Sequence, residues 1–429
     1  MSEKQLRIND KQTYDNSALK LILICVALYA ISYLGRKSYD SNINEIMSFY
    51  GIDKGAAGLV GTCFFITYAL GQVFHGIMCK YYNPKIVVFI ALVVCGLCNF
   101  VMGIMPSSGF VFLKYVWIIN GFASAALWSL LIMLLNKVLA AKHIKQALFA
   151  MCFPVSIGVF IVYIVSALCS SLNAFKWTFY FAAILITAIA FYWIFSYKSL
   201  VGKCIKEKED LDGVAVNLSE KRQKGKRERT KIDFSFVILF GVLALFAIVD
   251  NFVKDGITTW TPTILKEKYA LDNSVSVLLT IMLPLFAVIG STFATVLNKK
   301  IDNYVSLCGV YFAVAAAILG ILILCLGLNT WVITLVCFML LSAGMSGVNN
   351  ILTNIFPLKS KGVNAGFVAG LIDGFCYLGS AASSFGLGFI AQGTGNWDGI
   401  MYLFLGLCLL CVILVFAYNA IKKFKRKKI

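Results

Sequence analysis

The segment KRQKGKRERTK, residues 221–231, lies within a polar stretch that runs from Lys198 to Asp233 and separates two long apolar regions. The chain has 429 residues, 60% of them hydrophobic and only 14% charged, and its mean hydropathy is +0.85. Soluble domains are about half apolar and about a quarter charged. Because so little polar surface is available, we exclude a cytosolic enzyme, a disordered protein and a secreted disulfide scaffold.

Working outward from this segment, about six apolar runs precede it and six follow it. A bilayer core about 30 Å thick needs roughly 20 apolar residues per helix, which is close to the length of each run. Barrel strands would alternate, and these runs do not. We predict an all-α membrane protein with 12 transmembrane helices in two pseudo-symmetric six-helix bundles. The predicted spans are 19–35 or somewhat longer, 56–79, 86–105, 110–135, 147–172, 175–197, 234–260, 275–297, 304–328, 331–356, 363–391 and 401–421.

The basic residues orient these spans, because cytoplasmic connections carry an excess of Lys and Arg. The odd-numbered connections contain only Lys54, Lys176, Lys266 and Lys268, whereas the tails and even-numbered connections hold most of the others. We therefore expect a multi-pass protein of the cell membrane with both termini in the cytoplasm. The predicted domains are a cytoplasmic tail (1–18), an N-terminal bundle (19–197), a basic cytoplasmic linker (198–233), a C-terminal bundle (234–421) and a basic cytoplasmic tail (422–429).

The formal charge of +18 does not predict nucleic-acid binding, because the basic residues lie between apolar runs rather than along one face. We interpret the linker as a topology anchor, with docking on anionic lipid as the alternative. No GxxxxGK[ST] loop is present and the cysteines lie mostly inside apolar runs, so no cofactor, metal or covalent catalysis is expected. One chain is expected to suffice for function.

Charged residues inside spans are the informative ones, because a charge at the bilayer centre costs about 2.5–3.5 kcal/mol or more. Arg36 and Lys37 follow the first apolar run at the end where basic residues should be scarce. They could snorkel to the outer surface. Alternatively, the helix continues to about Met47 and buries one of them. Neighbours on a helix point about 100° apart, so at most one faces the interior, and we favour Arg36.

Lys254 is the second misplaced cation, at a matching depth in the equivalent span of the second half. Two cations facing each other across a central cavity suit one dianion, such as a phosphate monoester. A guanidinium binds phosphate bidentately, whereas an ammonium acts as a point charge. Asp250, one turn before Lys254, or the adjacent Asp255 could instead pair with the lysine, which would leave a site for a monoanion.

Other polar residues inside spans have several interpretations. Asp373 could be a hydrogen-bond hub, a proton-coupling group or a substrate contact. His75 could relay protons but is more simply a packed, hydrogen-bonded histidine. Singly, aromatic and amide side chains in spans usually serve packing, but as a set near the axis they could hydrogen-bond a sugar. This set comprises Tyr33, Tyr68, Gln72, Trp128 and Tyr377.

Four stretches resemble a known family: YLGRKSY (33–39), DNFVKDGITTWTPTILKEKYALD (250–272), NAGFVAGLIDGFCYLGSAASS (364–384) and GNWDGIMYLF (395–404). They are similar to the organophosphate:phosphate antiporters of the major facilitator superfamily, which include bacterial glycerol-3-phosphate and hexose-phosphate exchangers. The resemblance implies the major facilitator fold and exchange of an organic phosphate for inorganic phosphate by alternating access.

The resemblance also implies roles for single residues. It places phosphate binding on Arg36 and on Lys254, where the family has arginine, and it matches Tyr68 and Trp128 to family residues. Gln72 stands where the family has lysine, and the family's histidine in the fifth span is absent near Phe153.

Two other functions compete with exchange. A proton-coupled carrier of another organic anion, such as a sugar acid, would use Asp250, Asp373 or His75 for the proton. A membrane sensor of sugar phosphate would bind the ligand without transporting it.

Overall fold

The computed structural model describes residues 3–212, 234–298, 300–301, 303–359 and 365–427, and within them the regular structure is helical. Twelve of the described helical segments are long and apolar enough to cross a membrane. This confirms the predicted fold class. The predicted linker lies largely outside the described residues, at 213–233.

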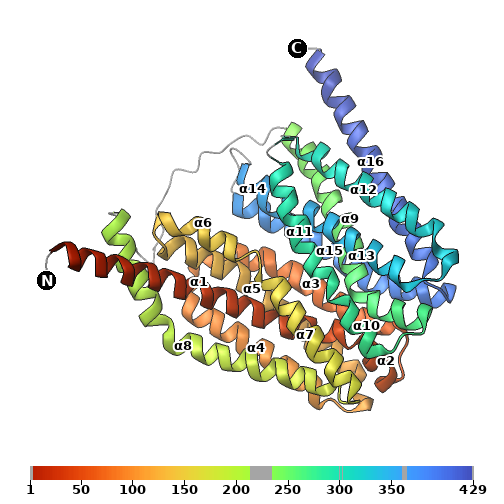
Figure 1. The fold of residues 1–429 in the computed structure, drawn as a ribbon, viewed down its shortest axis with the longest axis horizontal. Coiled ribbons are helices and arrows are strands. Elements are labelled where there is room, and N and C mark those ends of the chain that lie inside the picture. The colour runs from red at the N-terminus through yellow and green to blue at the C-terminus, as the bar shows by residue number, and fades with distance from the viewer. Residues whose placement is uncertain (1–2, 213–233, 299, 302, 360–364, 428–429) are drawn as a thin grey trace.

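The first half of the chain contains six of these spans (Figure 1). Its helices are α1 (Glu3–Ser41), α2 (Ile43–Tyr50), α3 (Lys54–Met78), η1 (Cys79–Tyr81), α4 (Pro84–Ile104), η2 (Ser107–Gly109), α5 (Phe110–Val138), α6 (Ala141–Ala150), α7 (Pro154–Ser171) and α8 (Lys176–Asp212).

The second half contains the other six. Its helices are α9 (Phe234–Tyr269), α10 (Asn273–Thr280), α11 (Met282–Leu297), α12 (Tyr304–Leu324), η3 (Leu326–Leu328), α13 (Trp331–Asn350), η4 (Ile351–Ile355), α14 (Phe356–Lys359), α15 (Ala365–Thr394) and α16 (Asp398–Lys427).

Local chemistry sets several helix starts. Asn83 precedes α4 and its side chain accepts a hydrogen bond from the Lys85 amide at 3.0 Å. Asn303 does the same for the Val305 amide at the start of α12. Asparagine is a preferred N-cap because its oxygen satisfies an otherwise unpaired helix N–H. The two caps stand at equivalent points of the two halves.

The chain is helical beyond two of the expected span ends. α1 ends at Ser41, and α2 follows after a single residue, so Arg36 lies well inside the first helix. α8 continues to Asp212, into the segment that the sequence analysis assigned to the linker. There the buried Glu207 accepts a contact from His143 at 2.9 Å, and Asp212 accepts from the Ala141 amide. These contacts hold the end of α8 against α6.

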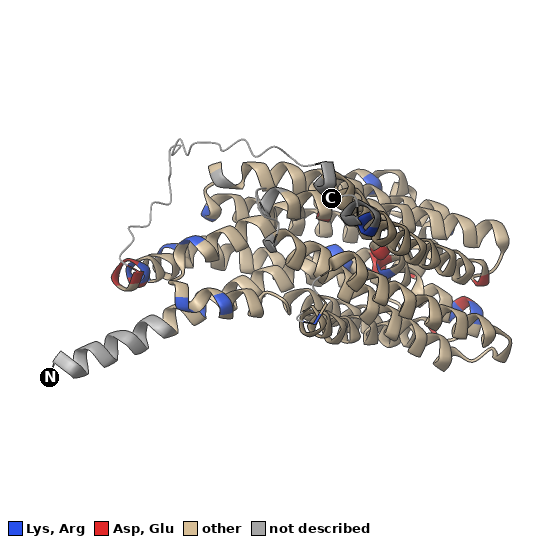
Figure 2. Cartoon of the chain, turned by 90° about the horizontal axis from the view of Figure 1, so that it is seen from above, with Lys and Arg blue, Asp and Glu red and all other residues tan. Residues whose placement is uncertain are grey.

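The outer surface of the bundle is apolar. Leu70, Phe195, Leu324 and Phe416 are each more than 60% exposed although they lie in spanning helices. In Figure 2 the Lys, Arg, Asp and Glu residues gather mainly toward the ends of long uncharged helical stretches. An exposed apolar surface of this extent is stable only against lipid. The chain is therefore a multi-pass membrane protein.

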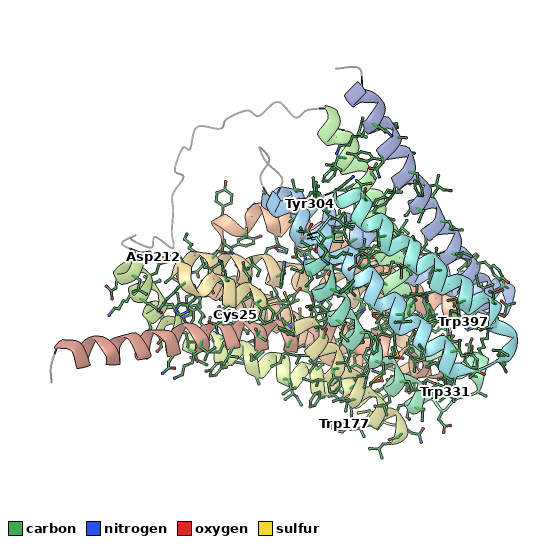
Figure 3. The ribbon with its side chains drawn as sticks, turned by 45° about the horizontal axis from the view of Figure 1, so that its top comes forward. Cys25, Trp177, Asp212, Tyr304, Trp331 and Trp397 are labelled. Carbon is green, nitrogen blue, oxygen red and sulfur yellow. The ribbon has the colours of Figure 1, made fainter. Side chains whose placement is uncertain are left out.

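The two halves diverge toward the side of the molecule where α1 begins and α16 ends, which we call the termini side (Figure 1). They meet on the opposite side, where α2 and α10 lie. In Figure 3, Asp212 and Tyr304 mark the termini side, while Trp177, Trp331 and Trp397 mark the opposite side. This arrangement positions α1, α3, α9 and α15 against the interface between the halves.

Candidate functional site

Arg36 is a buried cation at the interface between the halves, and it forms no ion pair with the residues that the structure describes. It is 5% exposed, and its Nη2 donates to the Tyr377 hydroxyl of α15 at 3.1 Å. Its guanidinium carbon lies 4.1 Å from the Tyr33 ring centroid and 4.3 Å from that of Tyr68. Nε and Nη1 are buried and have no hydrogen-bond partner. A guanidinium held by aromatic rings, with two donor nitrogens unused, can accept an anion.

The neighbouring Lys37 is neutralised. Its Nζ lies 2.6 Å from Asp40 Oδ2, and both side chains are largely buried. Its ammonium also lies 5.4 Å from the Phe65 ring centroid. Arg36 and Lys37 border the same small cavity with Asp40, Phe64 and Trp117. Of the two adjacent cations, only Arg36 therefore keeps donor groups without a partner.

Lys254 lies in α9 and is half-buried. Its nearest charged and polar groups include Asp255, Asp250 and, from the other half, Tyr33. Among the residues that the structure describes it forms no ion pair. Tyr33, whose ring holds Arg36, lies within electrostatic range of Lys254. The two cations therefore share a neighbour at the interface between the halves.

The two aspartates beside Lys254 have other partners. Asp250 is fully buried and accepts a hydrogen bond from the Asn251 amide at 3.2 Å. Its second oxygen has no partner. Asp255 accepts from the Ser380 hydroxyl of α15 at 2.5 Å. The structure thus holds both carboxylates near Lys254 without forming a permanent pair with it.

Asp373 and Tyr377 lie one helical turn apart on α15, and both are half-buried. Tyr377 packs against Tyr68 of the first half, with ring centroids 4.2 Å apart and the ring planes tilted by 49°. Asp373 lies within electrostatic range of both Lys254 and Arg36. This is the group of predicted residues that the fold brings together across the interface between the halves.

Two further predicted residues surround this group. The Gln72 amide donates to the Tyr68 hydroxyl at 3.0 Å. Trp128 of α5 packs against Tyr29, with ring centroids 5.0 Å apart. They extend the polar and aromatic lining from Arg36 toward the termini side.

His75 lies apart from the group. Its two ring nitrogens contact the Phe122 carbonyl oxygen at 3.2 Å and the Tyr82 hydroxyl at 3.3 Å. These partners belong to α5 and to the turn before α4, so the contacts tie three segments of the first half together. Of the two interpretations of His75, the structure shows the packed, hydrogen-bonded histidine.

Sequence reasoning missed Tyr29. It packs against Tyr33, with ring centroids 5.3 Å apart, and lies within electrostatic range of Arg36. The spacing of residues 29, 33 and 36 is that of one helix face and could have revealed it. The same spacing recurs on the other inner helices, in the pairs 68/72, 250/254 and 373/377.

On the opposite side, a hydrogen-bonded network joins the halves. The Asn273 amide of α10 contacts Asn44, Glu45 and Ser170 of the first half, and Thr263 donates to Asn44 at 2.7 Å.

Nearby, Lys54 pairs with Glu267 at 3.1 Å. α3 and α15 also approach so closely there that a Cβ on Gly58 would lie 2.2 Å from the Ser384 carbonyl oxygen. Ser384 in turn donates to the Gly58 carbonyl oxygen at 2.9 Å. Small residues at this crossing let the two backbones touch. The halves are therefore closed against each other on the opposite side.

The family of the chain follows from its sequence profile. The model of the Major Facilitator Superfamily matches residues 25–384. The chain belongs to the major facilitator superfamily and is a membrane transporter of that fold.

Its curated relatives agree with the resemblance seen in the sequence. A "Probable hexose phosphate transport protein" of Chlamydia trachomatis serovar D is 26% identical over 118 residues, 28% of this chain and 25% of that protein. "Membrane sensor protein UhpC" of Escherichia coli (strain K12) is 29% identical over 102 residues, 24% of this chain and 23% of that protein. The matched stretches span about a quarter of these relatives.

Solved structures match over nearly the whole chain. A bacterial homologue of the human lysosomal transporter Spinster, in an inward-facing and occupied conformation, has a TM-score of 0.73 at 12% identity and covers 94% of this chain and 96% of that one. A D-xylose-proton symporter has a TM-score of 0.66 at 12% identity, with 94% and 98% covered. These likenesses establish the fold.

Proposed function

We propose that this protein exchanges an organic phosphate, of the sugar phosphate or glycerol phosphate class, for inorganic phosphate. The observation that carries the proposal is Arg36, buried at the interface with two donor nitrogens unpaired. Lys254 lies within electrostatic range of Tyr33 and forms no ion pair among the described residues. A phosphate monoester carries about −1.5 to −2 charges near neutral pH and accepts hydrogen bonds through its oxygens. Both cations can bind it together.

Exchange follows from the same charges. When the site is empty, neither cation has a dedicated counter-ion, and an unpaired buried charge is costly. Either phosphate or its ester relieves that cost. The conformational change that carries the site from one side of the membrane to the other is therefore easier when the site is occupied than when it is empty. This favours exchange over one-way transport. With both termini in the cytoplasm, as the basic connections predict, the conformation described above is closed toward the outside.

Counterflow in vesicles tests this proposal. The full-length protein is reconstituted into liposomes loaded with inorganic phosphate, and uptake of labelled phosphate and of labelled hexose 6-phosphate is measured. We expect phosphate inside to accelerate uptake of both. Equal rates with phosphate-loaded and sulfate-loaded vesicles would contradict exchange.

A sensor is the second candidate, because one relative is named a membrane sensor protein. A sensor would bind hexose 6-phosphate in detergent, for example in a calorimetric titration, yet give no flux in the vesicles. The same preparation therefore separates the two functions.

A further inference from the structure

Asp373 is the acidic side chain of the site that lacks a partner. Of the three aspartates near Lys254, Asp255 accepts from Ser380 and Asp250 accepts from Asn251. Among the described residues, Asp373 forms neither a hydrogen bond nor an ion pair. It is half-buried in the middle of a spanning helix. A carboxylate in that position needs a donor, and the part of the chain that the structure describes supplies none.

The position of Asp373 relative to Arg36 follows from helix direction. α15 runs from the termini side to the opposite side, so Asp373 lies one turn, about 6 Å, closer to the termini side than Tyr377. Tyr377 is the residue that Arg36 contacts at 3.1 Å. A phosphate bound by Arg36 would therefore place its organic part beside Asp373.

The charges of the site also favour a ligand that carries a positive group beside Asp373. The unpaired cations are Arg36 and Lys254, while Asp250, Asp255 and Asp373 are all within range of Lys254 or of one another. A phosphate satisfies the two cations but leaves Asp373 without a donor among the described residues. A ligand that also brings a positive group to Asp373 satisfies all three side chains. The buried nitrogens of Arg36 that lack a hydrogen-bond partner are a second, independent feature that points to a ligand here.

We infer that the preferred organic substrate carries an ammonium group about one helical turn from its phosphate, and that Asp373 binds this ammonium. The inference rests on the proposed function and narrows its substrate class to amino-substituted phosphate esters. Arg36 and Lys254 hold the phosphate, and Asp373 selects the substituent. In an amino sugar 6-phosphate the amine and the phosphate lie at opposite ends of one ring, a separation that matches this spacing.

The test compares two esters that differ by one group. Phosphate-loaded vesicles carrying the full-length protein are given glucosamine 6-phosphate or glucose 6-phosphate, and kcat/KM is measured for each. We expect a preference of about tenfold or more for the amine, the scale of one charge-assisted hydrogen bond. Asp373→Asn should reduce the preference, measured as the ratio of kcat/KM for the two esters, to near one. Asp373→Glu should retain part of it.

Asp210→Asn is the matched control, since Asp210 is exposed at the end of α8, and it should leave the ratio unchanged. A ratio near one in the unsubstituted protein overturns the inference even if Asp373→Asn fails to fold, while phosphate exchange itself would stand. If Asp373→Asn instead abolishes a proton flux that accompanies glucose 6-phosphate, Asp373 carries a proton and the inference is wrong. Absence of flux with every phosphate compound would overturn the proposed function as well.

Discussion

At the scale of single residues, the environment of Arg36 explains how a cation persists inside a membrane protein. Burying it at the bilayer centre costs about 2.5–3.5 kcal/mol or more. Each aromatic face returns about 0.5–2 kcal/mol through cation–π attraction, and Arg36 lies over the rings of Tyr33 and Tyr68. The rings stabilise the charge without using its N–H donors. The donors therefore remain for a ligand, which a salt bridge would have prevented.

The first prediction concerns the shape of that cation. Arg36→Ala should lower kcat/KM for phosphate exchange at least about 100-fold, because two charge-assisted hydrogen bonds are lost. Arg36→Lys should also be strongly impaired, because an ammonium cannot bind phosphate bidentately. Exchange rates in phosphate-loaded vesicles measure both. Lys300→Ala, at an exposed position on the termini side, is the control, and activity of Arg36→Lys close to that of the unsubstituted protein would show that only the charge matters.

The second prediction concerns Lys254. Lys254→Arg keeps the positive charge and should retain measurable exchange, whereas Lys254→Ala should lose it, because one of the two cations is removed. Initial uptake rates at saturating phosphate distinguish them. Equal activity of the two variants would indicate that the lysine has only a structural role. Lys300→Ala, at an exposed position on the termini side, serves as the control for removing a lysine.

At the scale of elements, the network around Asn273 closes the halves on the opposite side. One amide connects α10 to α2 and α7 through Asn44, Glu45 and Ser170. These bonds must break if the halves separate there. Since each contributes about 0.5–1.5 kcal/mol, a single residue can bias the conformational equilibrium by a measurable amount.

The third prediction is that Asn273→Ala depopulates this conformation. Spin labels on Asp212 and Lys300, exposed on the two halves at the termini side, report the distance by pulsed electron resonance. We expect a larger fraction of the molecules to show a short distance between the two spin labels, because opening on the opposite side accompanies closing on the termini side. Asn136→Ala is the control, since the Asn136 amide bonds only to its own helix, at the Ile132 carbonyl oxygen. An unchanged distribution would show that the network does not hold the halves.

At the scale of the whole molecule, the same interface links conformation to pH. Glu45 lies between the halves, and burial raises the pKa of its carboxyl above the ordinary value, despite bonds from Asn273 and Ser170 and the charge of Lys266. One of its oxygens is buried without a partner. Separation of the halves on this side would hydrate Glu45 and restore its ordinary pKa, about 4.3. The closed interface therefore binds the proton more tightly than the open one.

The fourth prediction follows from the tighter binding of the Glu45 proton in the closed interface. Above its raised pKa, the ionised Glu45 opposes closure. As the pH falls through the raised pKa toward about 4.3, closure on the opposite side should increase, and below that value the effect should saturate. The spin-label distances measured against pH test this, with Glu45→Gln expected to resemble low pH at every pH. A pH response that persists in Glu45→Gln would assign the effect to another group.

The sequence predicts those features of the site that depend on one segment of the chain, and it does not predict contacts between side chains of different segments. The apolar runs placed the spans, and the unusual depth of Arg36 and Lys254 marked both cations. Helix geometry predicted that at most one of Arg36 and Lys37 faces the interior, and this was wrong, because both border one cavity. Lys37 differs from Arg36 in its pairing with Asp40, which depends on side-chain conformation. His75 could not be separated from the site by sequence, because its partners Phe122 and Tyr82 lie on other segments. Tyr29 was missed because a tyrosine in a span is ordinarily packing.

The number of spans, the division into two halves and the identity of the buried charges were determined by sequence alone, because they depend on local hydropathy and on the cost of placing a charge in lipid. The tertiary structure decided which charges have partners. Whether a carboxylate meets an ammonium, a hydroxyl or nothing depends on contacts between helices far apart in the chain, such as Asp255 with Ser380 and Arg36 with Tyr377. Only the packing of α1, α3, α9 and α15 specifies those contacts.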